Sequence, residues 1–560
     1  MDGFSSAVWS KQSLIGTILE SLWIHCGNGK LVKARSQASP SGCFLGRIVS
    51  VRMVRPSSHL WIFPSGLTRL EISQGVMRRH ALLLAPFFFY MRILMHRIVS
   101  LPSWNRWFCF MKKATMVCAG IVFAGLFGFS TSVVNAGEPK SLFNGKDFDG
   151  WHGRPTVDPR KWESTPEADK AKWNKEIADH WRVDNGEIVN DGQGAYLSTN
   201  ADFGDFDLML DYRIVKDCDS GIYLRGIPQV QIWDPDAENN RKNGNEKGSG
   251  GLWNNPAGWA GKDPLVRADN PVGQWNTMKM RLVGERCWVW LNDKPVVVNA
   301  RLHDYFAPGQ PLIQRGPIQL QTHGAEIRFK NVKLQEFSAE EANEILRKAE
   351  DEELSKSSKK FDVLFNGKDL AGWQGAVGNY TVTEGAVQCL QGKGGVLYSE
   401  KSYGDFVFRV DFQLPPAGNN GLAIRYPSAE ELEQLPKDQR HGDAAYVGMT
   451  ELQVLDDAHP NYKSIDARQA HASAYGMVAA KRGYLRPTGQ WNHQVVTVNG
   501  SKIQVELNGT KILDADLATV NEYMANTPHP GKDRASGHIG FAGHSDPVKF
   551  RNIEILPSAN

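Results

Sequence analysis

The chain has 560 residues and a formal net charge of +3, and this charge is unevenly distributed. Residues 1–110 carry 13 Lys and Arg against 3 Asp and Glu, whereas residues 137–560 carry 49 basic and 58 acidic residues, a net charge of −9. An acidic body offers no electrostatic basis for binding DNA or RNA, so we exclude a nucleic-acid partner. The length predicts several domains rather than one core.

Three cysteines follow residue 136, namely Cys218, Cys287 and Cys389. They are too few and too widely spaced for a disulfide scaffold or a cysteine-based zinc site. We therefore expect the hydrophobic core alone to hold the fold together.

Residues 111–136 have the layout of a secretory signal peptide. Lys112 and Lys113 form its basic start, an apolar stretch spans residues 117–129, and small residues close it at Ala136. We predict that the signal is removed after Ala136. The mature protein is then secreted or periplasmic in a bacterium.

Residues 1–110 precede this signal, although a signal peptide belongs at the start of a protein. We interpret them as a mis-assigned or disordered extension, with translation starting at Met111. The alternative is a membrane anchor in the apolar run His80–Met95. Pro86 and Arg92 interrupt that run, and it is shorter than the about 20 apolar residues of a membrane-spanning helix. We predict no transmembrane span in the mature chain.

The sequence contains an internal repeat. SLFNGKDFDGWHGR begins at Ser141, and VLFNGKDLAGWQGA begins at Val363. Further matches follow in the same order: FGDFDLMLDYR with YGDFVFRVDFQ, SGIYLRG with NGLAIRY, GQWN with GQWN, WLND with ELNG, GPIQLQTHG with GHIGFAGHS, and IRFKNVKL with VKFRNIEI. Because the matches occur in the same order in both halves, they indicate a duplicated domain of about 195 residues. We place the two units at residues 137–337 and 361–557.

Each unit alternates apolar and polar residues over short runs, as in residues 206–212 and 276–282. This period of two, with frequent Gly, Asn, Asp and Pro between runs, predicts antiparallel strands in a two-sheet sandwich. The Asn508-Gly509 pair predicts a tight hairpin. The repeated FNGKD motif predicts a first strand, a turn at Asn144-Gly145, and the return of Trp151 to the core.

Residues 338–360 separate the two units and are highly charged. Ser338 followed by Glu341 fits a capping box, which predicts a helix starting there. We interpret this helix as a spacer rather than a partner-binding element.

Polar side chains recur on one face of several predicted strands in the first unit. Period two places Arg225 beside Tyr223, and it groups residues 229, 231 and 233 in the same way. The candidate residues are Tyr223, Arg225, Gln229, Gln231, Trp233, Asp234, Gln319, Gln321 and His323. Fixed donors and acceptors beside an indole suit a carbohydrate. The plainer alternative is that these residues are structural.

The second unit offers a related but different face. Its candidate residues are Arg425, Glu451, Gln453, Asp456 and His544. Gly540 and Ala542 stand where the first unit has its two late glutamines. We therefore expect the two faces to differ in depth and hydrogen-bonding capacity, so that the units need not accept the same ligand.

A long glycine-rich segment covers residues 234–270 of the first unit and contains Trp253 and Trp259. Loops of this length are commonly functional, so we predict a lid or a sugar platform that includes Trp253. No ligand spacing typical of a metal site occurs in either unit, and the sequence assigns no metal ligand.

The motifs LFNGKD, SGIYLRG, PQVQIWD, GSGGLWNN, GQWN, GPIQLQTHG and IRFKNV resemble a large bacterial family named the 3-keto-disaccharide hydrolase domain, formerly a domain of unknown function. The resemblance covers residues 141–337 closely and 362–556 more loosely. It implies an all-β fold of two tandem concanavalin/laminin-G-like jelly-roll sandwiches, joined here by the short helical linker.

The resemblance also implies a substrate, a small carbohydrate or glycoside whose C3 hydroxyl another enzyme, a 3-oxidising dehydrogenase, has already converted to a ketone. Such a ketone acidifies the C2 hydrogen, so a base and a stabiliser of the enolate suffice for cleavage. For catalysis we assign His323 and Arg225, with His544, Arg425 and Glu451 in the second unit. The remaining candidates would bind substrate, and a divalent metal on the ketone could replace or assist the arginine.

Two other functions fit the same fold class. A non-catalytic lectin-like protein would use two sandwich modules to gain avidity on a polymer. A cell-surface protein would use the sandwiches as spacers.

Overall fold

The computed structural model describes residues 23–26, 30–33, 138–436 and 448–558. The chain divides into two compact units, residues 1–129 and 130–560. Within residues 1–129, β1 (Trp23–Cys26) pairs antiparallel with β2 (Lys30–Lys33). The rest of the predicted extension, the apolar run His80–Met95 and the predicted signal peptide lie outside the described residues. Among the helices that are described, none is long and apolar enough to span a membrane.

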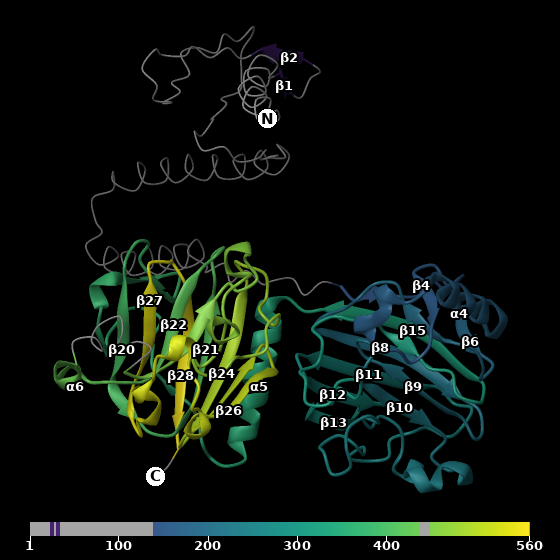
Figure 1. Cartoon of the computed structure of the whole chain (residues 1–560). Coiled ribbons are helices and arrows are strands. Elements are labelled where there is room, and N and C mark those ends of the chain that lie inside the picture. Colours follow the sequence, from purple (N-terminus) through teal and green to yellow (C-terminus); the bar gives the residue numbers. More distant parts are fainter. Residues whose placement is uncertain (1–22, 27–29, 34–137, 437–447, 559–560) are drawn as a thin grey trace, which may run out of the picture. The chain divides into compact units, whose positions relative to one another are not determined.

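The first sandwich consists of a five-stranded sheet, in the order β10-β9-β14-β7-β4, and an eight-stranded sheet, in the order β13-β12-β11-β8-β15-β6-β5 with β3 beside β15 (Figure 1). The strands are β3 (Lys140–Ser141), β4 (Trp151–Arg154), β5 (Trp181–Asp184), β6 (Glu187–Asn190), β7 (Tyr196–Thr199), β8 (Phe206–Ile214), β9 (Asp219–Tyr223), β10 (Gln229–Trp233), β11 (Asn276–Val283), β12 (Arg286–Leu291), β13 (Lys294–Arg301), β14 (Gln319–Leu320) and β15 (Ile327–Glu336). Its helices are α4 (Glu167–His180) and the short 3-10 helices η1 (Pro159–Ser164), η2 (Glu238–Asn243) and η3 (Asn245–Lys247).

The second sandwich repeats this plan, with an eight-stranded sheet β18-β19-β28-β21-β24-β25-β26 plus β16 beside β28, and a five-stranded sheet β17-β20-β27-β22-β23. The strands are β16 (Asp362–Val363), β17 (Trp373–Gly375), β18 (Tyr380–Thr383), β19 (Ala386–Cys389), β20 (Gly394–Tyr403), β21 (Phe406–Gln413), β22 (Asn419–Tyr426), β23 (Thr450–Leu455), β24 (Trp491–Asn499), β25 (Lys502–Leu507), β26 (Thr510–Asp516), β27 (Gly537–His544) and β28 (Lys549–Pro557). Helix α6 (Ala429–Gln434) follows β22, and 3-10 turns occupy η4 (Val377–Asn379), η7 (Pro460–Tyr462), η8 (Ala467–Gln469), η9 (Leu517–Thr519), η10 (Met524–Asn526) and η11 (Pro530–Asp533).

Alternating side chains explain why these runs form sandwiches. In β8, Phe206, Leu208 and Leu210 are buried in the core between the two sheets. Asp207 and Asp211, on the opposite face of the strand, make ion pairs and hydrogen bonds instead. Period-two burial in strands is what a half-covered sheet requires. The predicted fold of two tandem jelly-roll sandwiches is confirmed.

The repeated FNGKD motif has the same geometry in both sandwiches. The Asn144 side-chain oxygen accepts hydrogen bonds from the backbone N–H groups of Lys146 and Asp147, and Gly145 follows with a φ of 78°. Trp151 is buried and donates its indole N–H to the Leu142 carbonyl at 2.8 Å. The second copy repeats these contacts, with its tryptophan 3.1 Å from the Leu364 carbonyl. The predicted structural role of the motif is confirmed.

The hairpin predicted at Asn508-Gly509 joins β25 to β26, and both residues have positive φ. The linker helix α5 (Ala339–Ser355) begins with the predicted capping box between Ser338 and Glu341. Both predictions followed from local turn and cap chemistry, which depends on few residues.

The interpretation of α5 as a spacer is wrong. Ala342, Leu346 and Ala349 of the helix are buried in one cluster with Val283 and Trp288 of the first sandwich. The opposite side of the helix forms ion pairs with the second sandwich through Arg347 and Glu350. A helix buried on both sides is part of the packing of residues 130–560.

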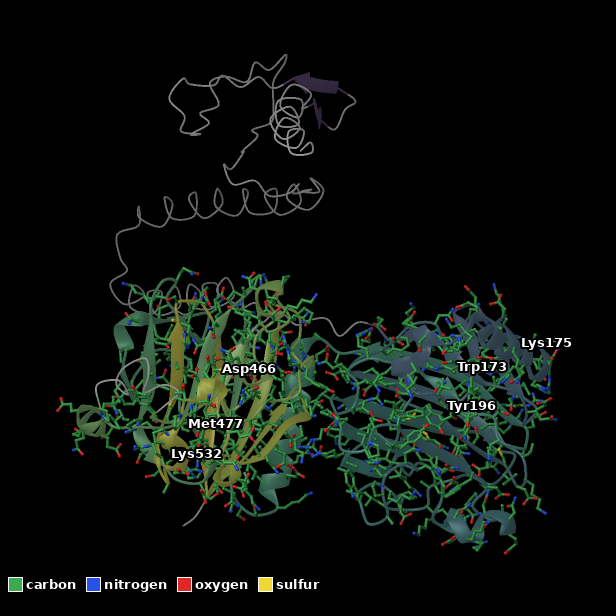
Figure 2. All side chains as sticks on the ribbon, viewed as in Figure 1. Trp173, Lys175, Tyr196, Asp466, Met477 and Lys532 are labelled. Atoms are coloured by element: carbon green, nitrogen blue, oxygen red, sulfur yellow. The ribbon has the colours of Figure 1, made fainter. Side chains whose placement is uncertain are left out.

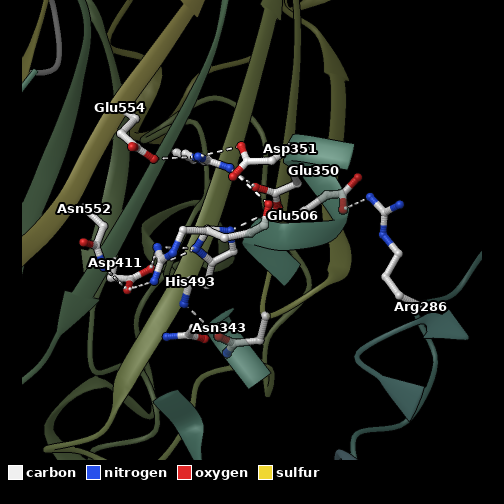
Figure 3. Close-up of polar contacts among 12 residues, drawn as sticks. Arg286, Asn343, Glu350, Asp351, Asp411, His493, Glu506, Asn552 and Glu554 are labelled. Carbon is white, nitrogen blue, oxygen red and sulfur yellow. Dashed lines mark hydrogen bonds and ion pairs between the residues drawn. The ribbon is translucent and has the colours of Figure 1, made fainter. Parts of the chain in front are cut away.

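Buried charges join α5 to the second sandwich (Figure 3). The Asp411 carboxylate, which is fully buried, accepts two hydrogen bonds from the Arg347 guanidinium at 2.7 and 2.6 Å. It also lies 2.9 Å from the Nδ1 atom of His493, whose Nε2 atom lies 3.1 Å from Glu350. The two carboxylates outweigh the effect of burial and raise the pKa of His493 to about 9. The imidazole is therefore a cation at neutral pH.

Candidate functional site

The outer face of the five-stranded sheet in the second sandwich brings together side chains from four strands. Leu422, Leu452 and Phe541 point into the core from β22, β23 and β27. Their neighbours in each strand face the opposite way. The register pairs Ala423 with both Gly540 and Glu451. Small residues in the centre of the sheet thus lie beside a carboxylate at its edge.

A cavity of about 390 Å³ opens on this outer face. Its lining comes mainly from β20 and β27, with contributions from the end of β17, from β22 and from α6. The lining residues are Gly375, Ala376, Gly395, Val396, Tyr398, Tyr426, Leu432, Ala542, Gly543 and His544. A concave site with a few polar groups at its rim is the usual form of a small-molecule site.

His544 and Glu451 form an imidazole–carboxylate pair at the edge of this cavity. The Nε2 atom of His544 lies 3.8 Å from the Oε1 atom of Glu451. The imidazole side chain is 48% exposed, whereas the Glu451 side chain is 3% exposed. Only the histidine can therefore contact a substrate directly, and Glu451 can influence a substrate only through the imidazole.

The environment shifts the titration of both groups. Interaction with the Glu451 carboxylate raises the pKa of His544 above its ordinary value. Burial raises the pKa of Glu451, and the imidazole only partly offsets this effect. Oε1 of Glu451 is buried and accepts no hydrogen bond. An imidazole held beside such a carboxylate is suited to take a proton and to be stabilised as a cation.

Gly421 makes room for this pair. A Cβ atom at residue 421 would lie 1.9 Å from Oε1 of Glu451. The carboxylate therefore lies directly over the glycine of the neighbouring strand. The first sandwich has glycine at the matching position, Gly221, where a Cβ atom would lie 2.5 Å from the side-chain nitrogen of Gln229.

The same face of the first sandwich is filled by its own side chains. The Tyr223 hydroxyl donates to the Gln229 oxygen at 3.0 Å, and the Gln229 nitrogen donates to Gln231 and Gln321 at 2.9 and 2.7 Å. The Gln321 nitrogen donates to the hydroxyl of Tyr196, labelled on β7 in Figure 2. These amides satisfy one another. They leave less hydrogen-bonding capacity for a ligand than we expected from the sequence.

His323 lies at the edge of this filled face. Its Nδ1 atom is 3.4 Å from the Asp219 carboxylate, which raises the pKa of the imidazole. Asp219 also accepts a hydrogen bond from the Gln231 side chain at 2.7 Å. Both sandwiches thus place a histidine beside a carboxylate, but the carboxylate comes from β9 in one and from β23 in the other.

The prediction that Arg225 and Arg425 stabilise a substrate oxyanion is wrong. The Arg225 guanidinium is buried and donates to the carbonyls of Gly204, Gly284 and Ile313 as well as to Asp205. The cause is local, because its φ of 52° breaks the strand alternation and turns the side chain away from the outer face.

Arg425 has a φ of 59° and repeats this arrangement. It donates to the carbonyls of Gly404, Gly500 and Arg534 and forms an ion pair with Asp405. Recurrence of the arginine in both units therefore reflects a shared structural role at the end of each sandwich.

Asp234 and Asp456 are also structural, contrary to prediction. The Asp234 carboxylate accepts hydrogen bonds from the backbone N–H groups of Asp217 and Asp236, and Asp456 accepts one from Ala417. Both carboxylates hold turns at the ends of strands, as aspartate commonly does. Both side chains are also buried, so they offer little surface to a substrate.

The remaining candidates lie on the outer faces. Trp233 is buried, donates its indole N–H to the Gly248 carbonyl, and packs edge-on against Trp253 with ring centroids 5.7 Å apart. The Lys262 ammonium lies 4.1 Å from the Trp253 ring centroid, so one face of the predicted sugar platform is covered. Gln319 is completely buried with both amide atoms unpartnered, and Gln453 is buried on β23 with an unpartnered oxygen.

Sequence reasoning missed two residues of the cavity, Tyr398 and Tyr426. Their rings lie 4.9 Å apart, and burial raises the pKa of each, in Tyr426 to about 12. A comparison of the repeats could have found Tyr398, since it pairs with Gly540, which stands where the first sandwich has Gln319.

The donor set of the site bears on the metal alternative. Within residues 138–436 and 448–558, no group of three or more His, Cys, Asp and Glu side chains gathers as a metal site would require. The imidazole of His544 and the carboxylate of Glu451 supply two possible ligands.

A family model described as the 3-keto-alpha-glucoside-1,2-lyase-like domain matches residues 138–335 and again residues 360–556. The chain belongs to this family. It contains two tandem copies of the lyase-like domain, as the repeat predicted, and its assignment to a family of carbohydrate-active enzymes is confirmed.

Individual relatives of the lyase-like domains are distant. A 3-keto-disaccharide hydrolase of Bacteroides thetaiotaomicron is 25% identical over 224 residues, which cover 34% of this chain and 76% of the relative. The crystal structure of a candidate glycosyl hydrolase from Parabacteroides distasonis covers 36% of this chain and 100% of its own, with 22% identity and a TM-score of 0.31. The carbohydrate-binding module CBM66 of Bacillus subtilis covers 35% of this chain and 99% of its own, with 15% identity and a TM-score of 0.21.

Proposed function

We propose that the second sandwich cleaves glycosides whose C3 hydroxyl has been oxidised to a ketone. The observation that carries this proposal is the His544–Glu451 pair at the edge of a cavity of about 390 Å³. An ordinary glycosidase needs two carboxylic acids across the scissile bond, and this site offers one carboxylate that is shielded by an imidazole. One exposed base is instead what elimination from a 3-keto sugar requires.

The reaction begins with proton transfer to the imidazole. Because Nε2 of His544 faces Glu451, Nδ1 is the atom that takes the proton from C2 of the sugar. The electrons of the broken C2–H bond form the enolate of the C3 ketone. The Glu451 carboxylate stabilises the imidazolium that results.

Collapse of the enolate restores the C3 ketone, forms a C1–C2 double bond and expels the substituent from C1. The leaving oxygen receives a proton from the imidazolium, and water then adds across the double bond to give a 3-keto sugar. Tyr398 and Tyr426 line the cavity, and burial raises the pKa of each phenol, so both stay protonated at neutral pH.

A direct assay tests this proposal. Protein comprising residues from Gly137 onward is incubated with 3-keto-trehalose or 3-keto-lactose, and we expect release of glucose, with none from unoxidised trehalose or lactose. Because the substrate must first be oxidised, a 3-oxidising dehydrogenase acts upstream. Absence of glucose release with both keto sugars, in the presence and in the absence of divalent metal ions, would refute the proposed reaction.

We further propose that the protein is exported through the signal at residues 111–136. The basic start, the apolar stretch and the small residues at the end of this segment support the proposal. The protein isolated from the periplasm or medium is then expected to begin at Gly137, which N-terminal sequencing would establish. A cell-associated product that retains residues 111–136 would contradict export by this route.

A further inference from the structure

We infer that the cavity of the second sandwich holds the leaving group of the substrate, and that this leaving group is an apolar aromatic aglycone rather than a second sugar. The inference rests on the proposed function, because it assumes that cleavage occurs at His544. It concerns the class of glycoside, which the family assignment leaves open.

The first argument is the chemistry of the cavity wall. Among its lining residues, His544 is the only one with an imidazole and none is acidic, and the two tyrosine phenols are the other polar side chains. The remaining lining is glycine, alanine, Val396 and Leu432. Val396, Ala542 and both tyrosine rings belong to one apolar cluster on this face, with Leu432 packed against it.

A sugar ring would be poorly accommodated by such a wall. Every buried hydroxyl group that loses water without gaining a hydrogen-bond partner opposes binding. An aromatic ring instead gains by leaving water and can pack against the rings of Tyr398 and Tyr426. The wall therefore favours an arene over a hexose.

The second argument is size. A cavity of about 150 Å³ lined by aliphatic and aromatic side chains is enough to bind benzene. The cavity here, at about 390 Å³, is more than twice as large. It can hold an aglycone of two fused or linked rings.

The third argument is the difference between the two copies. The register places Tyr223, Gln319 and Gln321 of the first sandwich where the second has Ala423, Gly540 and Ala542. All three replacements remove volume, and two of them remove an amide. The cavity is apolar because it lacks the polar side chains that the first sandwich carries at these positions, which could have bonded to sugar hydroxyls.

The fourth argument is the direction of the site. His544 lies at one side of the cavity, and Glu451 and Gln453 lie on β23, beyond β22 from the cavity floor. The apolar wall beside the imidazole therefore suits the group that leaves from C1, and the scissile bond lies next to Nδ1 of His544.

The test measures both binding and turnover. We expect wild-type protein to bind 2-naphthol, followed by fluorescence titration, and to cleave 4-nitrophenyl 3-keto-glucoside with a lower KM than 3-keto-trehalose. Ala542→Gln introduces the residue that the first sandwich carries at this position, so the sheet should tolerate it. We expect it to weaken 2-naphthol binding and to raise the KM of the aryl glycoside by about tenfold, with a much smaller effect on the disaccharide.

Gln321→Ala in the first sandwich is the matched control, and it should leave all three values unchanged. Cleavage of 3-keto-trehalose without 2-naphthol binding, or an equal effect of Ala542→Gln on both substrates, would overturn the aglycone assignment while the proposed reaction stands. Saturable 2-naphthol binding that Ala542→Gln abolishes, without turnover of any 3-keto glycoside, would leave an arene site and refute the reaction.

Discussion

Replacement of His544 by alanine is expected to lower kcat for cleavage of 3-keto glycosides by roughly 10²–10⁴-fold, the usual contribution of a general base. The imidazole side chain is half exposed at the cavity edge, so its removal leaves no void in the core. The folded state should therefore persist, which circular dichroism and the thermal unfolding midpoint would show. Steady-state kinetics with a 3-keto glycoside measure the loss.

His323→Ala provides the matched control in the first sandwich. This histidine also lies beside a carboxylate, but its sheet face is filled by hydrogen-bonded amides. We expect His323→Ala to retain most of the activity. The opposite result, with His323 essential and His544 dispensable, would move the reaction to the first sandwich and contradict the assignment.

Glu451→Gln distinguishes a positioning role from a structural one. The carboxylate raises the pKa of His544, and a base is active only when it is neutral. Removing the charge lowers that pKa, so the rise of kcat/KM with pH should shift to lower pH. The activity at the plateau should also fall, because a weaker base remains. An unchanged pH profile would exclude this role for Glu451.

Asp411→Ala is expected to destabilise the fold by about 3–5 kcal/mol, because it removes the buried carboxylate that Arg347 and His493 share. The carboxylate is fully buried between the Arg347 guanidinium and the protonated His493 imidazole. Urea unfolding of the wild type and the variant, monitored by tryptophan fluorescence, would measure the difference.

Asp211 is the counterpart of Asp411 in the first sandwich and serves as the control. It accepts hydrogen bonds from Thr277 at 2.7 Å and from Asn331 at 2.6 Å in a solvent-accessible position. We expect Asp211→Ala to cost about 1 kcal/mol or less. An equal loss of unfolding free energy in the two variants would show that the buried charge network stabilises the fold no more than the exposed hydrogen bonds of Asp211 do.

The sequence predicted the fold because its strongest signals are local. Period two decides which side chains share a face of a strand, and this places Glu451 with Gln453 and His323 with Gln321 from the sequence alone. The exchange of glutamines for Gly540 and Ala542 also pointed to faces of unequal depth. The cavity lies on the emptier face.

Other features depend on information that one sequence does not carry. The left-handed backbone at Arg225 reverses the direction of its side chain, and an arginine gives no sign of positive φ in the way a glycine does. The partners of α5 were equally hidden, since Arg347 and Asp411 are 64 residues apart along the chain. Tertiary contacts of that kind, rather than local preference, decide the role of a charged helix.

The packing of α5 has a practical consequence for dissecting the protein. A fragment cut where the second family match begins, at residue 360, would lack Arg347 and Glu350. Asp411 would then lose its ion pair with Arg347, and His493 would lose its ion pair with Glu350. The smallest autonomous version of the second copy should instead start at Ser338, so that homology boundaries and folding boundaries differ here by one whole helix.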